Sequence, residues 1–147
     1  RSVYQFFTGD FISRCICLVF FLAFPTTNTR PVITGGGLWN QAALWLYSID
    51  AADNLFPSIH CLVSWFCYLG IRGRKEIPCW YQRVSMVIAV LVFASTLLTK
   101  QHVIVDVAGG ILLAELCFFI GKKTDLYRIY ERFGSRIEQK ICELTEG

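Results

Sequence analysis

Two histidines and one aspartate are the side chains of this sequence whose types and spacing favour catalysis. His102 and Asp106 lie four residues apart, so in a helix they share one face, one turn apart. A carboxylate in that position holds one imidazole nitrogen and leaves the other available for chemistry. The second histidine, His60, lies in a different segment of the chain. The functional interpretation therefore depends on whether the two segments meet in space.

The composition is typical of a membrane protein. Hydrophobic residues make up 54% of the chain and charged residues only 17%, whereas a soluble domain carries about 25% charged residues. The net charge of +3 is not that of a nucleic-acid-binding protein, so we expect no nucleic-acid partner. The basic residues lie beside apolar runs, as cytoplasmic anchors of membrane helices do.

Apolar runs predict an all-α integral membrane bundle with about four spans in this chain. Residues 26–37 between the first two spans favour turns, and residues 38–49 suit an interfacial helix with aromatic residues. The predicted domains are a membrane-embedded domain over residues 1–121 and a cytoplasmic basic tail over residues 122–147. The four expected spans are residues 11–25, extended back toward Phe6 for length, and residues 57–71, 84–98 and 103–121.

The charged loops give these spans one consistent orientation. His60, His102 and the Arg30-Pro31 loop fall on one side of the membrane. By the positive-inside rule, this is the extracytoplasmic side. The basic residues expected on the cytoplasmic side are Arg14, Arg72, Arg74, Lys75, Lys122 and Lys123.

If the three loops on the histidine side converge, their side chains suit the binding of a phosphate. Arg30 can clamp a phosphate with its planar guanidinium, and Lys100 is a second candidate cation. The backbone N–H groups of a helix beginning near Ser58 favour an anion. Each of these residues also has a structural alternative, namely an interfacial anchor for Arg30 and Lys100 and a helix cap for Ser58.

The histidines then supply the chemistry of phosphoryl transfer. This reaction needs in-line positioning and stabilisation of charge on the phosphoryl oxygens. His102, oriented by Asp106, can attack phosphorus, and His60 can protonate the leaving oxygen. Two histidines with few nearby carboxylates make a poor metal site, so we expect no metal and no other cofactor.

Three segments resemble the three motifs of the type 2 phosphatidic acid phosphatase superfamily. They are Arg30-Pro31, Pro57-Ser58-Ile59-His60, and Ser95 with His102 and Asp106 at the family's spacing. The resemblance implies a six-helix membrane bundle, of which about two N-terminal helices are missing from this chain. It also implies an enzyme acting on a lipid phosphate, in which His60 is the acid and His102 becomes a phosphohistidine.

The segments depart from the family's motifs at three positions. Ala23 stands where the family has a lysine, Ile59 replaces a glycine, and Thr96 replaces an arginine. The residues around His60 and His102 look more like the branch that contains inositol phosphorylceramide synthases and related lipid phosphotransferases. Whether the acceptor is water or a lipid hydroxyl stays open.

Other functions and features are left open by the sequence. The missing lysine and arginine motivate an alternative, a non-catalytic relative that binds lipid or a partner. A transporter or channel subunit is less favoured, because charged residues lie mostly at span ends. Glu115, inside the last span, requires a partner or water, and the sequence assigns it no role; the oligomeric state is not predicted.

Overall fold

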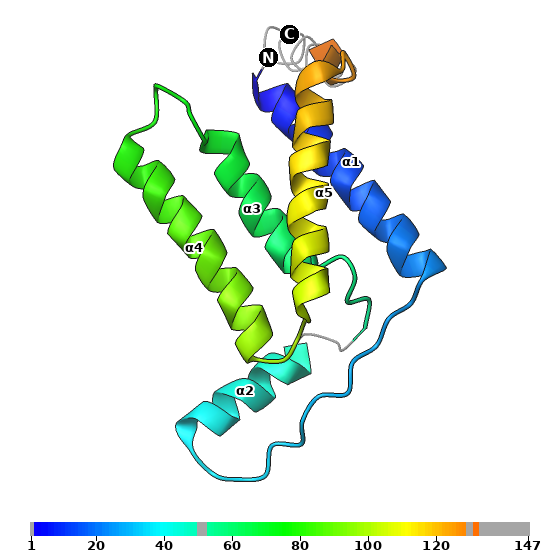
Figure 1. Cartoon of the computed structure of the whole chain (residues 1–147), viewed down its shortest axis with the longest axis vertical. Coiled ribbons are helices and arrows are strands. Elements are labelled where there is room, and N and C mark those ends of the chain that lie inside the picture. The colour runs from blue at the N-terminus through cyan, green and yellow to red at the C-terminus, as the bar shows by residue number, and fades with distance from the viewer. Residues whose placement is uncertain (1, 50–52, 129–130, 133–147) are drawn as a thin grey trace, which may run out of the picture.

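The computed structural model describes residues 2–49, 53–128 and 131–132. Within these residues the chain forms five α-helices and no strand. Figure 1 shows four of the helices forming a bundle and α2 lying at its lower end. The predicted fold class, an all-α membrane bundle, is confirmed. The helices are α1 (Ser2–Ala23), α2 (Leu38–Ile49), α3 (Ile59–Ile71), α4 (Cys79–Leu98) and α5 (Ile104–Lys123).

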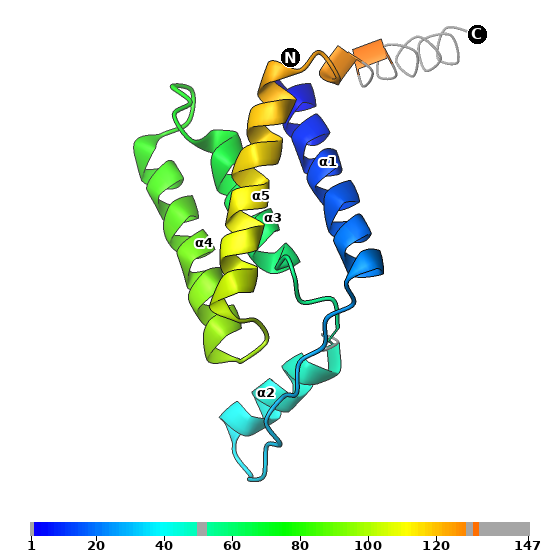
Figure 2. The same ribbon diagram turned by 45° about the vertical axis from the view of Figure 1, so that its right-hand side comes forward.

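Helix α5 holds the bundle together. It packs against both α1 and α3, and α3 also packs against α4. Figures 1 and 2 both show α5 between α1 and α4. Small residues allow this close approach, because a β-carbon on Gly121 would lie 2.6 Å from the carbonyl oxygen of Gln5 in α1. The core includes Cys17 of α1, Leu62 and Phe66 of α3, and Ala114, Cys117 and Phe118 of α5.

Three helices, α1, α4 and α5, are long and apolar enough to cross a membrane. Helix α3 has 13 residues and is therefore about 20 Å long, whereas the hydrocarbon core of a bilayer is about 30 Å thick. The expected span over residues 57–71 is thus a shorter helix, because Pro57 and Ser58 precede it. The outer side of α4 exposes Val87, Ile88 and Leu91, as a lipid-facing helix does.

Two helices begin earlier than the sequence predicts, and one charged residue lies elsewhere than expected. Helix α1 begins at Ser2, ahead of the apolar run, and α4 begins at Cys79, five residues before the expected span. Arg14 was expected at the cytoplasmic side but lies in the middle of α1. Its Nε is 2.8 Å from Oδ2 of Asp10, one turn earlier, so the helix continues past two charges that neutralise each other.

Glu115 has two partners on α3 and in the loop that follows it. The indole N–H of Trp65 donates to Glu115 Oε1 at 3.0 Å. The guanidinium of Arg72 donates to both carboxylate oxygens, at 3.0 and 3.4 Å. The Glu115 carboxylate, although inside an apolar helix, is therefore paired with the Arg72 cation and hydrogen-bonded by the neutral Trp65 indole. These contacts connect α5 to α3 and to the loop that follows it.

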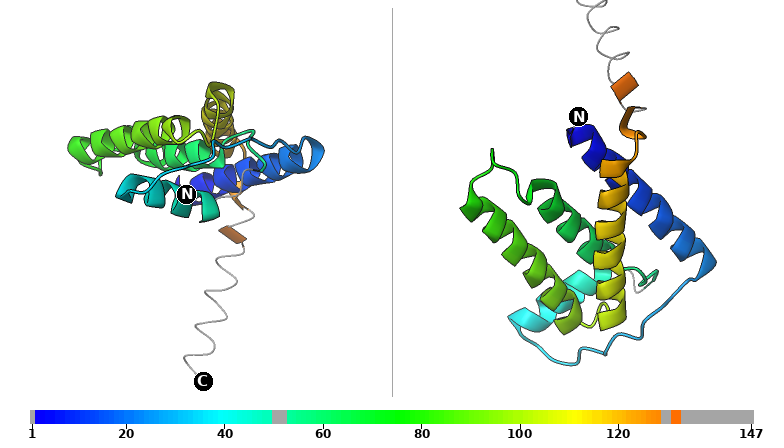
Figure 3. Two further views of the ribbon diagram at one scale, coloured as in Figure 1. Left: turned by 90° about the horizontal axis from the view of Figure 1, so that it is seen from below. Right: turned by 45° about the horizontal axis from the view of Figure 1, so that its top comes forward.

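The histidines and the basic loop lie at opposite ends of the bundle. Helices α3 and α5 both begin at the lower end in Figure 1, and helix α2 lies outside the bundle at this end (Figures 2 and 3). Helix α2 has the bounds expected of an interfacial helix, and its Trp39 is 83% exposed. Of the predicted cytoplasmic tail, residues 129–130 and 133–147 lie outside the described residues.

Candidate active site

His102 and Asp106 occupy the turn where α5 begins. Val103 is the N-cap residue, and its backbone N–H donates to Asp106 Oδ2 at 3.0 Å. The same oxygen lies 3.5 Å from His102 Nδ1. Both side chains are buried, with exposures of 8% for His102 and 6% for Asp106. Asp106 therefore caps the helix and also faces one nitrogen of the imidazole, which leaves Nε2 on the opposite edge of the ring.

The backbone of His102 is fixed by the turn that ends α4. The carbonyl oxygen of Thr96 accepts hydrogen bonds from the N–H groups of Gln101 and His102, at 3.0 and 3.2 Å. The N–H of Lys100 donates to the carbonyl oxygen of Leu97, which completes a Schellman motif. Lys100 has a φ of 54°, the left-handed conformation that this motif requires.

His60 lies in the first turn of α3, opposite His102. The centroids of the two rings are 5.9 Å apart, and the ring planes meet at 65°. This separation is well within the range in which two groups can reach one reacting phosphate. The structure therefore brings together the two histidines that the sequence places in separate segments.

The starts of α3 and α5 are joined through Ser58. Its N–H donates to the carbonyl oxygen of Asp106 at 3.1 Å, and its Oγ accepts from the N–H of Cys61 at 3.4 Å. A β-carbon on Gly110 of α5 would lie only 2.6 Å from the Ser58 carbonyl oxygen, so glycine allows this contact. Ser58 itself is fully buried, as expected of a helix cap, and its phosphate-binding role stays a prediction.

Two helix N-termini therefore meet beside the histidine pair. Each N-terminus carries a partial positive charge from its unpaired N–H groups and the helix dipole. Both α3 and α5 begin within a few residues of a histidine, at Ile59 and Ile104. The arrangement favours an anionic group such as a phosphate near the two rings.

Arg30 contacts Tyr47 of α2, and Tyr47 connects it to the end of the bundle that carries the histidines. Its guanidinium lies 4.7 Å from the centre of the Tyr47 ring, and Nη1 donates to the Tyr47 carbonyl oxygen at 3.2 Å. The Tyr47 hydroxyl in turn donates to the carbonyl oxygen of Thr99 at 2.8 Å. Lys100 has an exposed side chain, and its carbonyl oxygen accepts from Asn28 Nδ2 at 2.9 Å. Phosphate binding by Arg30 and Lys100 stays a prediction.

Two mainly apolar pockets adjoin His60. One, of about 460 Å³, is lined by His60, Gln101 and Thr96, with Leu46 and Ile49 from α2. The other, of about 430 Å³, lies between α1, α3 and α4 and is lined by His60, Val63 and Ser64, with Arg14 from α1 and Val92 from α4. An apolar chain attached to a group held at the histidines has space on either side of His60.

Sequence reasoning missed three residues at this end of the bundle. Gln101 is 5% exposed and lines the pocket beside His60, and its position next to His102 was an available signal. Tyr47 was interpreted only as part of an aromatic belt. Thr96 was considered only as a missing arginine, yet its carbonyl oxygen holds the turn that contains His102.

Comparison with known families agrees with the geometry. The PAP2 superfamily matches residues 1–120, which is most of the chain and includes both histidines. The chain belongs to the PAP2 superfamily. Neither the curated proteins nor the solved structures contain a match to this sequence. Membership supports a phosphatase-type membrane function in general terms.

The departures from the PAP2 motifs can now be located in the structure. Thr96, at the arginine position, is 4% exposed, and its hydroxyl donates to the Phe93 carbonyl oxygen and lies 3.7 Å from the Cys61 sulfur. Ile59, at the glycine position, is the first residue of α3. Ala23, at the lysine position, is the last residue of α1 and is exposed. None of the three residues supplies a cation to a phosphate.

Proposed function

We propose that this PAP2 protein transfers or hydrolyses a phosphate ester of a lipid through a phosphohistidine on His102. The observation that carries the proposal is the facing pair of imidazole rings, with centroids 5.9 Å apart. Asp106, 3.5 Å from one nitrogen of His102, completes the arrangement expected of an oriented nucleophile.

In the first step, His102 Nε2 attacks phosphorus, a P–N bond forms, and the P–O bond to the leaving alcohol breaks. His60 donates a proton to the leaving oxygen, so that a neutral alcohol departs. Asp106 stabilises the positive charge that develops on the His102 ring. The two helix N-termini stabilise the charge on the phosphoryl oxygens.

In the second step, an acceptor O–H attacks phosphorus and the P–N bond breaks. His60 now removes the acceptor's proton, which restores the starting protonation states. Water as acceptor gives a lipid phosphate phosphatase. A lipid hydroxyl gives a phosphotransferase of the kind found in the branch with inositol phosphorylceramide synthases, which the residues around His60 and His102 resemble.

A lipid substrate fits the surroundings of the histidine pair. The two pockets that share His60 combine polar side chains with apolar ones such as Ile49, Val63 and Val92, and most of their exposed surface is apolar. An acyl chain can occupy such a pocket while its phosphate lies between the rings. The basic residues at the opposite end of the bundle support an extracytoplasmic position for the site.

The experiment compares the unchanged chain with His102→Ala and His60→Ala in neutral-detergent micelles. Phosphate release and headgroup exchange are measured on a lipid phosphate, and brief incubation with labelled substrate detects a phosphorylated protein. We expect no phosphoprotein with His102→Ala, and slow turnover with His60→Ala. Gln41→Ala, on the exposed surface of α2, is the control and retains full activity. Full activity in His102→Ala would refute the mechanism.

The alternative is a non-catalytic relative that binds a lipid or a partner protein. It is favoured by Ala23 and Thr96, which leave two of the family's phosphate-binding cations absent. The same experiment distinguishes the two functions. A lipid that binds without phosphoprotein formation, phosphate release or headgroup exchange would support the alternative.

A further inference from the structure

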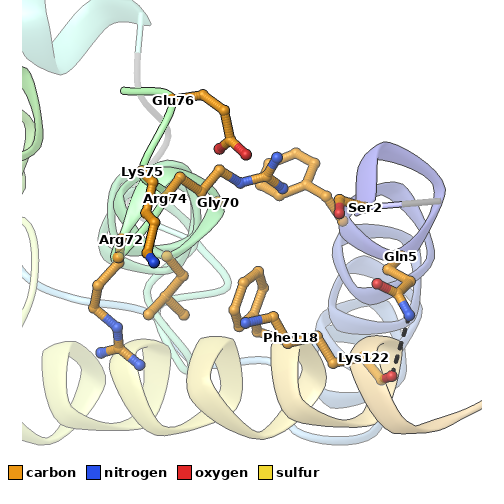
Figure 4. A pocket seen from close by; sticks show the side chains of 12 residues that line it. Ser2, Gln5, Gly70, Arg72, Arg74, Lys75, Glu76, Phe118 and Lys122 are labelled. Carbon is orange, nitrogen blue, oxygen red and sulfur yellow. Dashed lines mark hydrogen bonds between the residues drawn. The ribbon is translucent and has the colours of Figure 1, made fainter. Parts of the chain in front are cut away.

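A polar cavity lies at the end of the bundle opposite the histidines. It has a volume of about 340 Å³ and lies among the start of α1, the end of α3 with the loop that follows, and the end of α5. Figure 4 shows the side chains around it. Four cations line it, namely Arg72, Arg74, Lys75 and Lys122, together with one carboxylate, Glu76.

The positive charge of this cavity is only partly compensated. Arg72 is engaged by Glu115, and Figure 4 shows its side chain directed toward α5. Three cations then remain against the single carboxylate of Glu76. Within the described part of the chain, neither Arg74 nor Lys75 forms an ion pair. An excess of positive charge in a concave site favours an anion.

Part of the lining of the cavity is apolar. Phe6, Leu69 and Phe118 contribute to its lining, and the Lys122 ammonium lies 4.6 Å from the centre of the Phe118 ring. Figure 4 shows the Lys75 side chain extending toward Phe118, and the Lys122 side chain running beside the Phe118 ring. A ligand in this cavity can therefore contact both cations and aromatic carbon.

The cavity adjoins an apolar groove that descends along the bundle. This groove, of about 420 Å³, shares Phe6, Gly70 and Arg74 with the cavity and continues past Cys67 and Tyr81 between α1 and α4. We propose that the cavity binds the phosphate headgroup of an anionic phospholipid, whose acyl chain follows the groove. The shared lining is the reason for a lipid rather than a free phosphate ester, because a free ester uses only the cavity. The proposal does not depend on the function proposed for the histidines.

The test measures binding by the shift in thermal unfolding midpoint in neutral-detergent micelles. Short-chain phosphatidylglycerol is the main probe, and glycerol 3-phosphate is the free phosphate ester. The test variant is Arg74→Gln with Lys75→Gln. The matched control is Arg83→Gln with Lys123→Gln, which removes the same charge from exposed positions outside the cavity. All titrations are repeated in His102→Ala, which excludes turnover as the cause of a shift.

We expect phosphatidylglycerol to raise the midpoint, and the test variant to bind it about tenfold more weakly, since two charge-assisted contacts are lost. The control should bind as the unchanged chain does. Equal affinity in the test and control variants would overturn the site. Equally tight binding of glycerol 3-phosphate would overturn the lipid as its ligand. If the double variant does not fold, the phosphatidylglycerol affinity of Lys75→Gln alone is compared with that of the control, and equal affinities would again overturn the site.

Discussion

Replacing Gly110 by alanine should separate the two histidines without touching either one. The added β-carbon would lie 2.6 Å from the carbonyl oxygen of Ser58 and 3.2 Å from the N of Leu62. Both neighbours are backbone atoms of α3 and its cap, so no side-chain rotation can relieve the contact. The start of α3, which carries His60, must therefore move away from α5, which begins beside His102.

The size of this movement follows from the contact distance. Ordinary van der Waals contact begins at 3.4 Å, so the start of α3 must shift by roughly 0.8 Å, the difference between 3.4 and 2.6 Å. A misplacement of about 1 Å can cost a factor of about 100 in rate. Forcing an extra methyl group into a packed interface also costs about 1–3 kcal/mol of stability.

Phosphate release from a lipid phosphate and the thermal unfolding midpoint are measured for Gly110→Ala. The control is Gly36→Ala, because an added β-carbon at Gly36 meets nothing within 4 Å. We expect a lower midpoint and an activity about 100-fold lower than that of the control. A Gly110→Ala protein with the same midpoint and activity as Gly36→Ala would refute the reasoning.

Four further substitutions, at three positions, test single contacts. Asp106→Asn keeps an oxygen for the helix cap but removes the charge beside His102, so kcat should fall by a factor of about 10²–10⁴; an unchanged kcat contradicts that role. Lys100→Gly relieves the left-handed backbone at φ 54° and should raise stability by about 1 kcal/mol. Lys100→Asn is a second variant, because asparagine also tolerates the left-handed backbone. A raised KM for the lipid phosphate in both variants would show that Lys100 binds phosphate. An unchanged KM would exclude phosphate binding by Lys100. Glu115→Ala should lower stability by at most about 1 kcal/mol in thermal unfolding, because it removes an exposed ion pair with Arg72 and the hydrogen bond from Trp65, with kcat unchanged. An unchanged midpoint would show that these contacts do not hold α3 against α5.

That the two histidines belong at the same end of the bundle was predictable from topology, whereas their close approach depends on how α3 packs against α5. Successive spans alternate in direction, so segments before the second and fourth spans must lie on the same side of the membrane. The bounds of α2 were predictable for a local reason, since a glycine-rich turn precedes an aromatic, amphipathic stretch ending at Ile49. Hydropathy alone did not reveal that α4 begins at Cys79, because the polar and aromatic residues there are helical without being deeply apolar.

The contacts that the sequence did not reveal are mostly between distant residues. Glu115 meets Arg72, a residue 43 positions away, and only tertiary packing brings them together. The burial of Ser58 depends on how closely Gly110 lets two helices approach. By contrast, the Asp10–Arg14 pair has i, i+4 spacing and could have been predicted as an ion pair inside one helix.

The central position of α5 has a consequence for the order of assembly. Helices α1 and α3 contact each other far less than either contacts α5, and α5 is the last of these helices in the chain. Because a chain is synthesised from its N-terminus, α1 and α3 enter the membrane before the helix that joins them. The histidine pair therefore forms only after α5 has entered the membrane, and a nascent chain that has not yet released α5 carries His60 without its partner in place.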